Sequence, residues 1–276
     1  MLSDKLRNRL SHLHRQTAAA GDVASPPPAS APAELPVCFP EGSVRETAKG
    51  PIFAAEVSLR DVYADGARLR EDYLAAFQRA AQLADEESLP SYLAPIVGAD
   101  PSAAAFIDTE TAGFHGRPLF LIGLAQFRED EVILTQYFAR DYAEEAGVLA
   151  QLAELLPRLE LLISFNGKAF DWPFVRDRMV YHRVACETSF AHLDLLHPSR
   201  RRWRARLPNC KLQTLERYLC GRWRRGDIPG EEIPQRYHDF VRAGDARLIA
   251  PVFHHNRLDV ITMIELLIAL VRPAPS

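Results

Sequence analysis

Two acidic residues separated by one position follow a short apolar segment of the chain. The segment 103–108 ends in Asp108, and Glu110 comes two residues later. Side chains alternate along an extended strand, so both carboxylates would lie on one face of a sheet. Carboxylate oxygens are the ligands that Mg²⁺ and Mn²⁺ prefer, so the pair predicts a cation site at a strand end. Two pairs with the same spacing lie in polar stretches and are interpreted as solvated surface: Asp85 with Glu87, and Glu129 with Glu131.

A second acidic residue of interest, Asp171, follows a turn. The short apolar segment 161–165 has the character of a buried strand and runs into Asn166 and Gly167, which favour a turn. A helix is expected over 170–182, with Asp171 in its first turn, where the helix dipole favours a negative charge. Asp171 is therefore either a helix cap or a carboxylate that joins Asp108.

A third group contains two histidines and an acid near the C-terminus. The mostly helical segment 246–271 includes His254, His255 and Asp259. His255 and Asp259 are four residues apart and share one face of a helix. His254 is five residues before Asp259 and points elsewhere unless it precedes the helix. The alternative is a surface histidine pair with a capping Asp.

The remaining pattern predicts the elements that position these groups. Further strands are expected over 43–60, 119–127, 131–138 and 190–195, and further helices over 69–83 and 144–156. The polar turn 128–130 between two of these strands predicts a hairpin. A hairpin followed by alternating helices and strands is typical of an α/β domain with a mixed sheet.

The domain organisation is read from shifts in composition. We expect an amphipathic N-terminal helix over 1–20, a Pro- and Ala-rich linker over 21–42, N-terminal strands and a helix over 43–100, and the main domain over 103–272.

The composition is that of a globular protein. Of 276 residues, 47% are apolar and 25% are charged, with 33 basic and 36 acidic side chains and a net charge of -3. The four cysteines form no C-x-x-C pair, which disfavours a zinc ribbon and fits a reducing compartment. The longest apolar run, 260–271, is too short for a membrane span. A cytoplasmic protein without a membrane partner is therefore expected.

The charge is unevenly distributed. Segment 197–226 contains ten Arg and Lys residues and one acid, Glu216, so it carries about +9 and leaves about −12 elsewhere. Arginines interleaved with aromatic rings suit phosphate neutralisation and base stacking, although ion pairs with acids elsewhere are the alternative. The predicted nucleic-acid-binding residues are Asn166, Lys168, Arg200, Arg201, Arg202, Trp203, Arg204, Arg206, Arg222 and Arg224.

Three acidic motifs in this order resemble those of the DEDD (DnaQ-like) exonuclease branch of the RNase H-like superfamily. Asp108 and Glu110 match its first motif, Asn166, Phe170 and Asp171 match its second, and Asp259 matches its fourth acid. The chain is most similar to bacterial YprB-like RNase H-like domain proteins, on the stretches 165–168, 192–198, 226–230 and 232–237.

The resemblance implies an RNase H-like fold, in which a mixed central sheet is flanked by helices, here with an N-terminal extension. It also implies a metal-dependent nuclease acting on DNA or RNA, expected to be a 3′–5′ exonuclease. Two divalent cations, Mg²⁺ or Mn²⁺, would be held by Asp108, Glu110, Asp171 and Asp259. His255, or alternatively His254, would orient or deprotonate the attacking water. Two alternatives are kept: a nucleic-acid-binding module that does not cut, and an RNase H-type endonuclease. For Asp194, a supporting role is expected rather than cation binding.

Overall fold

The computed structural model describes residues 31–113, 116–224 and 226–272. The chain divides into two units, Met1–Ala31 and Pro32–Ser276, and the architecture below is that of the second unit. The predicted helix 1–20 and residues 21–30 of the predicted linker lie outside the described residues.

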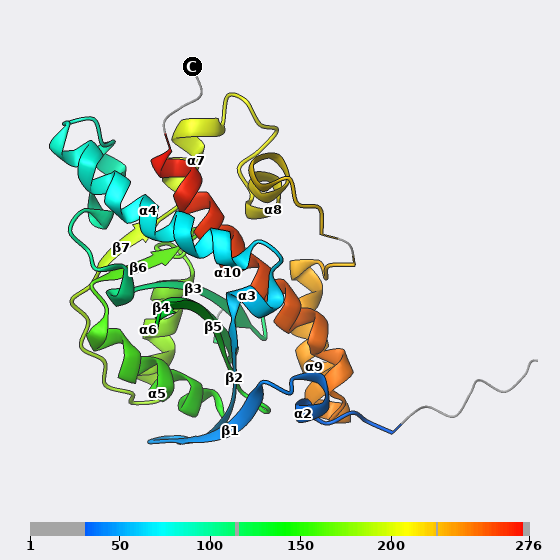
Figure 1. Ribbon diagram of the computed structural model, residues 1–276. Helices are drawn as coiled ribbons and strands as arrows, with labels where there is room; N and C mark the ends of the chain where they lie inside the picture. The colour runs from blue at the N-terminus through cyan, green and yellow to red at the C-terminus, as the bar shows by residue number, and fades with distance from the viewer. Residues whose placement is uncertain (1–30, 114–115, 225, 273–276) are drawn as a thin grey trace, which may run out of the picture. The chain divides into compact units, whose positions relative to one another are not determined.

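Seven strands form one mixed sheet in the order β1-β2-β5-β4-β3-β6-β7 (Figure 1). The strands are β1 Gly42–Thr47, β2 Gly50–Ser58, β3 Ala104–Thr111, β4 Leu119–Arg128, β5 Glu131–Phe138, β6 Leu161–Ser164 and β7 Ala191–Asp194. Four neighbouring pairs are antiparallel: β1 with β2, β2 with β5, β5 with β4, and β4 with β3. Strand β6 pairs in parallel with both β3 and β7. The mixed sheet predicted from the sequence is confirmed.

The strands of segment 43–100 belong to this same sheet. β2 pairs with β5 over six residue pairs, so β1 and β2 extend the sheet of the main domain. The expected division near residue 103 is therefore replaced by a continuous sheet. The sequence pattern could not show this, because the partner of β2 lies some 80 positions further along the chain.

Helices cover both faces of the sheet (Figure 1). The α-helices among the described residues are α2 Leu35–Cys38, α3 Leu59–Val62, α4 Gly66–Asp85, α5 Glu145–Leu155, α6 Asp171–Tyr181, α7 Leu196–Trp203, α8 Leu212–Leu215, α9 Ile233–Ala243 and α10 Ala250–Val271. Of these, α2, α3, α7 and α9 were not predicted, and α2 lies within the segment 21–42 that was expected to be a linker. Among these helices, none is both long enough and apolar enough to cross a membrane.

The alternation of β3 divides the core into two layers. Ala105 and Ile107 belong to a cluster with residues of α5, α6 and α9, whereas Ala104 and Phe106 belong to a cluster with residues of α4 and α10. Because successive side chains point to opposite faces, these two clusters lie on opposite sides of the sheet. The side chains of Asp108 and Glu110 continue the series of Ala104 and Phe106, on the face that α10 covers.

One glycine brings α10 close to the sheet. A Cβ atom at Gly123 of β4 would lie 2.0 Å from Oδ1 of Asn256 on α10, which is shorter than any real contact. Gly123 stands between Asp108 of β3 and Gln136 of β5 in the strand register. A side chain at position 123 would therefore push α10 away from the end of β3 where the acids lie.

Candidate functional site

The site begins with the two acids of β3. Asp108 and Glu110 lie near the end of this strand, and both are partly buried. Between them, Thr109 points to the opposite face, and its hydroxyl donates to Oδ1 of Asp171 at 2.5 Å. β3 thus presents two carboxylates toward α10 and also fixes a third carboxylate from α6.

Asp171 is presented by a loop that Asp194 holds in place. The loop follows β6, and Asn166 in it adopts the left-handed region with φ 66°. One carboxylate oxygen of Asp194 accepts the backbone N–H of Asn166 at 2.8 Å, and the other accepts that of Lys168 at 3.1 Å. A Cβ at Gly167 would lie 2.5 Å from Oγ of Ser164, so the chain turns tightly there. Asp194 therefore shapes the loop that leads to Asp171.

Helix α10 contributes Asp259 and one of the two histidines. Nε2 of His255 lies 3.4 Å from Oδ2 of Asp259, one helical turn later. His255 is 7% exposed, whereas His254 is exposed on the helix. Of the two candidates left open by the sequence, the structure places His255 against the acid.

An amide pair that the sequence did not single out holds Asp108. Nδ2 of Asn256 donates to Oδ2 of Asp108 at 2.8 Å, and Oδ1 of Asn256 accepts from Nε2 of Gln136 at 3.0 Å. The fully buried Asn256 lies over Gly123 of β4. Its amide links Asp108 of β3 to Gln136 of β5, the strands on either side of β4. It fixes the orientation of Asp108 relative to α10. The only sequence signal for Asn256 was its position, one residue after His255, in a helix expected to pack on the core.

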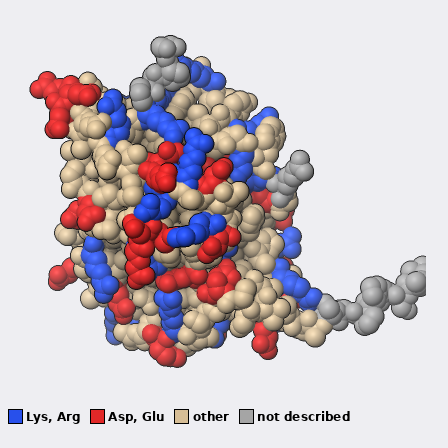
Figure 2. All heavy atoms as spheres, viewed as in Figure 1, with Lys and Arg blue, Asp and Glu red and all other residues tan. Residues whose placement is uncertain are grey.

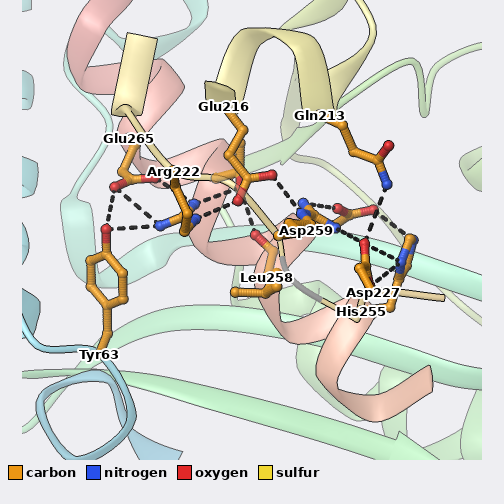
Figure 3. A network of polar contacts seen from close by, with 11 residues as sticks. Tyr63, Gln213, Glu216, Arg222, Asp227, His255, Leu258, Asp259 and Glu265 are labelled. Atoms are coloured by element: carbon orange, nitrogen blue, oxygen red, sulfur yellow. Dashed lines mark hydrogen bonds and ion pairs between the residues drawn. The ribbon is translucent and has the colours of Figure 1, made fainter. Parts of the chain in front are cut away.

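A second group of residues that the sequence did not assign to the site lies in segment 216–227 (Figure 3). Asp227 accepts from Nδ1 of His255 at 2.9 Å. The guanidinium of Arg224 contacts three carboxylates: Glu216 at 2.5 Å, Asp227 at 3.1 Å and Asp259 at 2.5 Å. Asp227 lies in the stretch 226–230, which resembles YprB-like proteins, and this resemblance was the sequence signal that could have indicated its role.

Arg222 belongs to the same network but faces away from Asp259. It pairs with the buried Glu216 and with Glu265 of α10, and it donates to the hydroxyls of Thr262 and Tyr63 (Figure 3). Glu216 therefore bridges two arginines, of which only Arg224 contacts an acid of the site.

Burial and mutual repulsion perturb the acids of the site. Burial raises the pKa of Asp108 well above its ordinary range, and the neighbouring carboxylates raise it further. Burial likewise raises the pKa of Asp171, and it raises that of Glu110 to about 8. Burial also raises the pKa of Asp259, although the charge of Arg224 opposes this. Positive charge added next to these buried acids would stabilise their ionised, carboxylate forms.

Burial lowers the pKa of His255, but this effect is outweighed. The hydrogen bond with Asp227 and the charges of Asp259 and Glu110 leave the pKa above its ordinary value. With each ring nitrogen facing a carboxylate, the charged imidazolium is the favoured form.

The four acids have the right chemistry for hard divalent cations, because such ions take oxygen ligands. Within the described parts of the chain, however, no three His, Cys, Asp or Glu side chains converge in a metal-binding arrangement. Three of the four acids are turned toward other partners: Asp108 toward Asn256, Asp171 toward Thr109 and Asp259 toward Arg224. The oxygen atoms of the four acids are of the type that binds a divalent cation, but the side chains would need to rotate to hold it.

The stability of the cation-free protein is expected to fall as the pH rises from 6 to 9. The pKa of Glu110 is about 8 in the folded chain and ordinarily 4.5, so folding favours its protonated form. This contribution to stability is complete below pH 4.5 and is lost as the pH rises through 8. The charged groups that interact with Glu110 include His255, Asp259, Asp171, Asp227 and Asp108. The raised pKa of His255 acts in the same direction.

Urea unfolding in EDTA at several pH values measures this effect. One proton gives a slope no steeper than about 1.4 kcal/mol per pH unit. Glu110→Gln should flatten the curve between pH 7 and 9. A slope identical in wild type and variant would show that Glu110 does not titrate there.

The basic segment is divided by the structure. Arg200, Arg201, Arg204 and Arg206 are exposed on and after α7, and Lys168 is exposed on the loop before α6. Figure 2 shows Lys and Arg interspersed with Asp and Glu on the face in view.

Four residues predicted to bind nucleic acid have internal contacts instead. Trp203 is 8% exposed and belongs to the core beneath α10. Arg202 donates to the backbone carbonyls of Leu270 and Arg272 at the end of α10. Arg222 and Arg224 are engaged by acids, as the alternative of internal ion pairing proposed. The assignment of these four side chains to nucleic acid is corrected, because their polar groups and ring surface are already used.

The sheet order, the helical layers and the acids at the end of β3 define an α/β protein with an RNase H-like fold. A model of the RNase H superfamily matches residues 105–271, and the chain belongs to this superfamily. The YprB protein of Bacillus subtilis (strain 168) is 36% identical over 168 residues, covering 59% of this chain and 40% of the relative. The chain thus spans well under half of that relative's length.

The fold is also similar to part of a solved structure. A family B DNA polymerase from the archaeon Pyrobaculum calidifontis superposes with a TM-score of 0.50 at 15% identity. The match covers 60% of this chain and 24% of the polymerase chain. At this identity the similarity concerns the fold.

Proposed function

We propose that the protein is a metal-dependent nuclease that hydrolyses phosphodiester bonds. The observation that carries this proposal is the set of four acids, Asp108, Glu110, Asp171 and Asp259, gathered at one end of the sheet in an RNase H superfamily domain. Burial raises the pKa of all four acids, and nearby carboxylates raise it further, so added positive charge would favour their ionised forms. Nucleic acid is the substrate class that the superfamily supports.

Two bound divalent cations would activate a water and neutralise charge on the leaving oxygen. The carboxylates of Asp108, Glu110, Asp171 and Asp259 would hold them. Asn256 keeps Asp108 oriented, and Thr109 does the same for Asp171.

His255 would orient the attacking water, or accept its proton when the ring is in its neutral form. Asp227 holds the ring at Nδ1, which leaves Nε2 directed at Asp259 and the reacting centre. Lys168 is exposed on the loop that leads to Asp171, where an ammonium group can attract a phosphate.

For the direction of attack we propose 3′–5′ exonucleolytic cleavage, as in the DEDD branch that the acidic motifs resemble. The test is a time course on DNA and RNA, single- and double-stranded, labelled at the 3′ or the 5′ end. Each substrate is incubated with Mg²⁺, Mn²⁺ or EDTA. We expect mononucleotides to be released first from the 3′ end, with a divalent cation and not in EDTA.

Other outcomes discriminate between the alternatives. Cleavage of a circular strand or internal cleavage of a 3′-blocked strand would favour an endonuclease. Binding without cation-dependent cleavage of any substrate would contradict the nuclease proposal and favour a binding module.

A further inference from the structure

A cavity of about 550 Å³ opens beside the acids of the site. Its walls come from α8, from the turn after it and from segment 222–229, and include Arg224 and Asp227. Asp227, which lines the cavity, contacts His255 (Figure 3), and Arg224, which also lines it, contacts Asp259. The cavity therefore adjoins the acidic site through these two side chains. A ligand of nucleotide size fits a volume of this order.

The outer wall of this cavity carries an exposed indole. The side chain of Trp223 is 63% exposed, and Tyr218 is also exposed. Both line the cavity. A large aromatic ring gains little stability when left in water, and an exposed ring that lines a cavity is a typical stacking surface for bases.

A cation lies on this indole. The guanidinium carbon of Arg217 is 3.4 Å from the centroid of the Trp223 ring. Within the described ranges, Arg217 forms no ion pair with an acid, in contrast to Arg222 and Arg224. Its charge is therefore available to a phosphate while its plane holds the ring in place.

We propose that this cavity binds an unpaired nucleotide of the nucleic-acid strand, with its base stacked on Trp223 and a phosphate paired with Arg217. The inference rests on the proposed function, because it supplies the strand that the acids would cut. An unpaired strand is favoured over a duplex, since only an unstacked base exposes its face to an aromatic ring. The cavity then directs the same strand toward Asp259 and His255.

The test measures binding without cleavage. Fluorescence anisotropy of labelled oligo-dT and oligo-U is recorded in EDTA with the full chain and with Trp223→Ala. The variant is expected to bind about 5- to 100-fold more weakly, which is the range for loss of one stacked base. Arg217→Gln should weaken binding and lower the slope of log affinity against log salt by about 0.7.

Tyr181→Ala is the matched control. Tyr181 is 70% exposed and is covered by the guanidinium of Arg178 at 4.4 Å, at the end of α6 remote from Asp171. Like Trp223 with Arg217, Tyr181 with Arg178 is an exposed ring covered by a guanidinium, but it lies on another surface. Loss of the Tyr181 ring should therefore leave oligonucleotide affinity unchanged. Thermal unfolding of all three variants checks that each is folded.

Three results would overturn the inference. In the first, Trp223→Ala binds single strands as tightly as wild type; in the second, Tyr181→Ala loses as much affinity as Trp223→Ala does. In the third, wild type cuts duplexes with a divalent cation but binds no single strand in EDTA. Each leaves the proposed nuclease intact, whereas absence of both binding and cleavage on every substrate would contradict the proposed function too.

Discussion

Asp108→Asn is expected to reduce phosphodiester cleavage by about 10³-fold or more while leaving the chain folded. Burial raises the pKa of Asp108 well above its ordinary range, and three nearby carboxylates raise it further. The amide has the same shape but lacks the charge that would hold a cation. Its oxygen can still accept the hydrogen bond of Asn256, so the contact with α10 is preserved.

Two measurements separate lost chemistry from lost structure. The rate of product release with saturating Mn²⁺ gives the first. The thermal midpoint in EDTA at pH 8 gives the second, and it should equal or exceed that of wild type, because one repelling charge is gone. Glu129→Gln is the control, as this exposed turn residue belongs to a pair with the same spacing and should leave the cleavage rate unchanged. Substantial cleavage by folded Asp108→Asn would contradict the two-cation proposal.

The part of the site that lies on regular elements was predictable from the sequence. The apolar run before Asp108 indicates a buried strand, and alternation then gives the face on which Glu110 lies. The interval between His255 and Asp259 likewise gives one helical turn, and the structure shows them in contact. In both cases a local period determines the relative placement of two side chains.

The partners of these acids come from distant parts of the chain and were not predictable in this way. Asn256 reaches Asp108 because Gly123 on β4 leaves room for it, which depends on the packing of α10 against the sheet. In the sequence, Arg224 was visible only as one residue of the basic segment. Asp227 was visible only as part of a stretch that resembles YprB-like proteins. Their roles follow from the course of segment 216–227, which contains no long regular element to reveal its position.

The charge count illustrates the same limit. A local excess of arginine suggested a surface for phosphate, but Arg222 and Arg224 are neutralised by acids on α10 and by Glu216. Counting charges along the chain cannot show which of them are paired across it. Among the described residues of the basic segment, the exposed arginines of and after α7, Lys211 and Arg217 form no ion pair with these acids.

Arg224→Gln is expected to strengthen the binding of Mn²⁺ by about tenfold or more and to destabilise the cation-free protein. In the structure, Oδ1 of Asp259 faces Arg224 at 2.5 Å and Oδ2 faces His255 at 3.4 Å. Both oxygens of this acid are thus already next to a cationic side chain. A divalent cation that binds Asp259 must work against the charge of Arg224, so removal of that charge favours it.

The cost to stability has a separate origin. Arg224 is 6% exposed and compensates three acids that remain in place when it is replaced. Removing one partner from a buried ionic group costs about 3–5 kcal/mol. Unfolding in EDTA should show this loss, and saturating Mn²⁺ should recover much of it by binding the native state. Arg224→Lys keeps the charge and should keep the wild-type affinity for Mn²⁺.

Arg222→Gln distinguishes competition for Asp259 from general damage to the network. Arg222 shares Glu216 with Arg224, but its other contacts are Glu265, Thr262 and Tyr63 rather than an acid of the site. This variant should lose stability in EDTA yet bind Mn²⁺ as wild type does, by calorimetric titration. If Arg224→Gln instead binds Mn²⁺ more weakly than Arg222→Gln, then Arg224 holds Asp259 in position for the cation and does not compete with it.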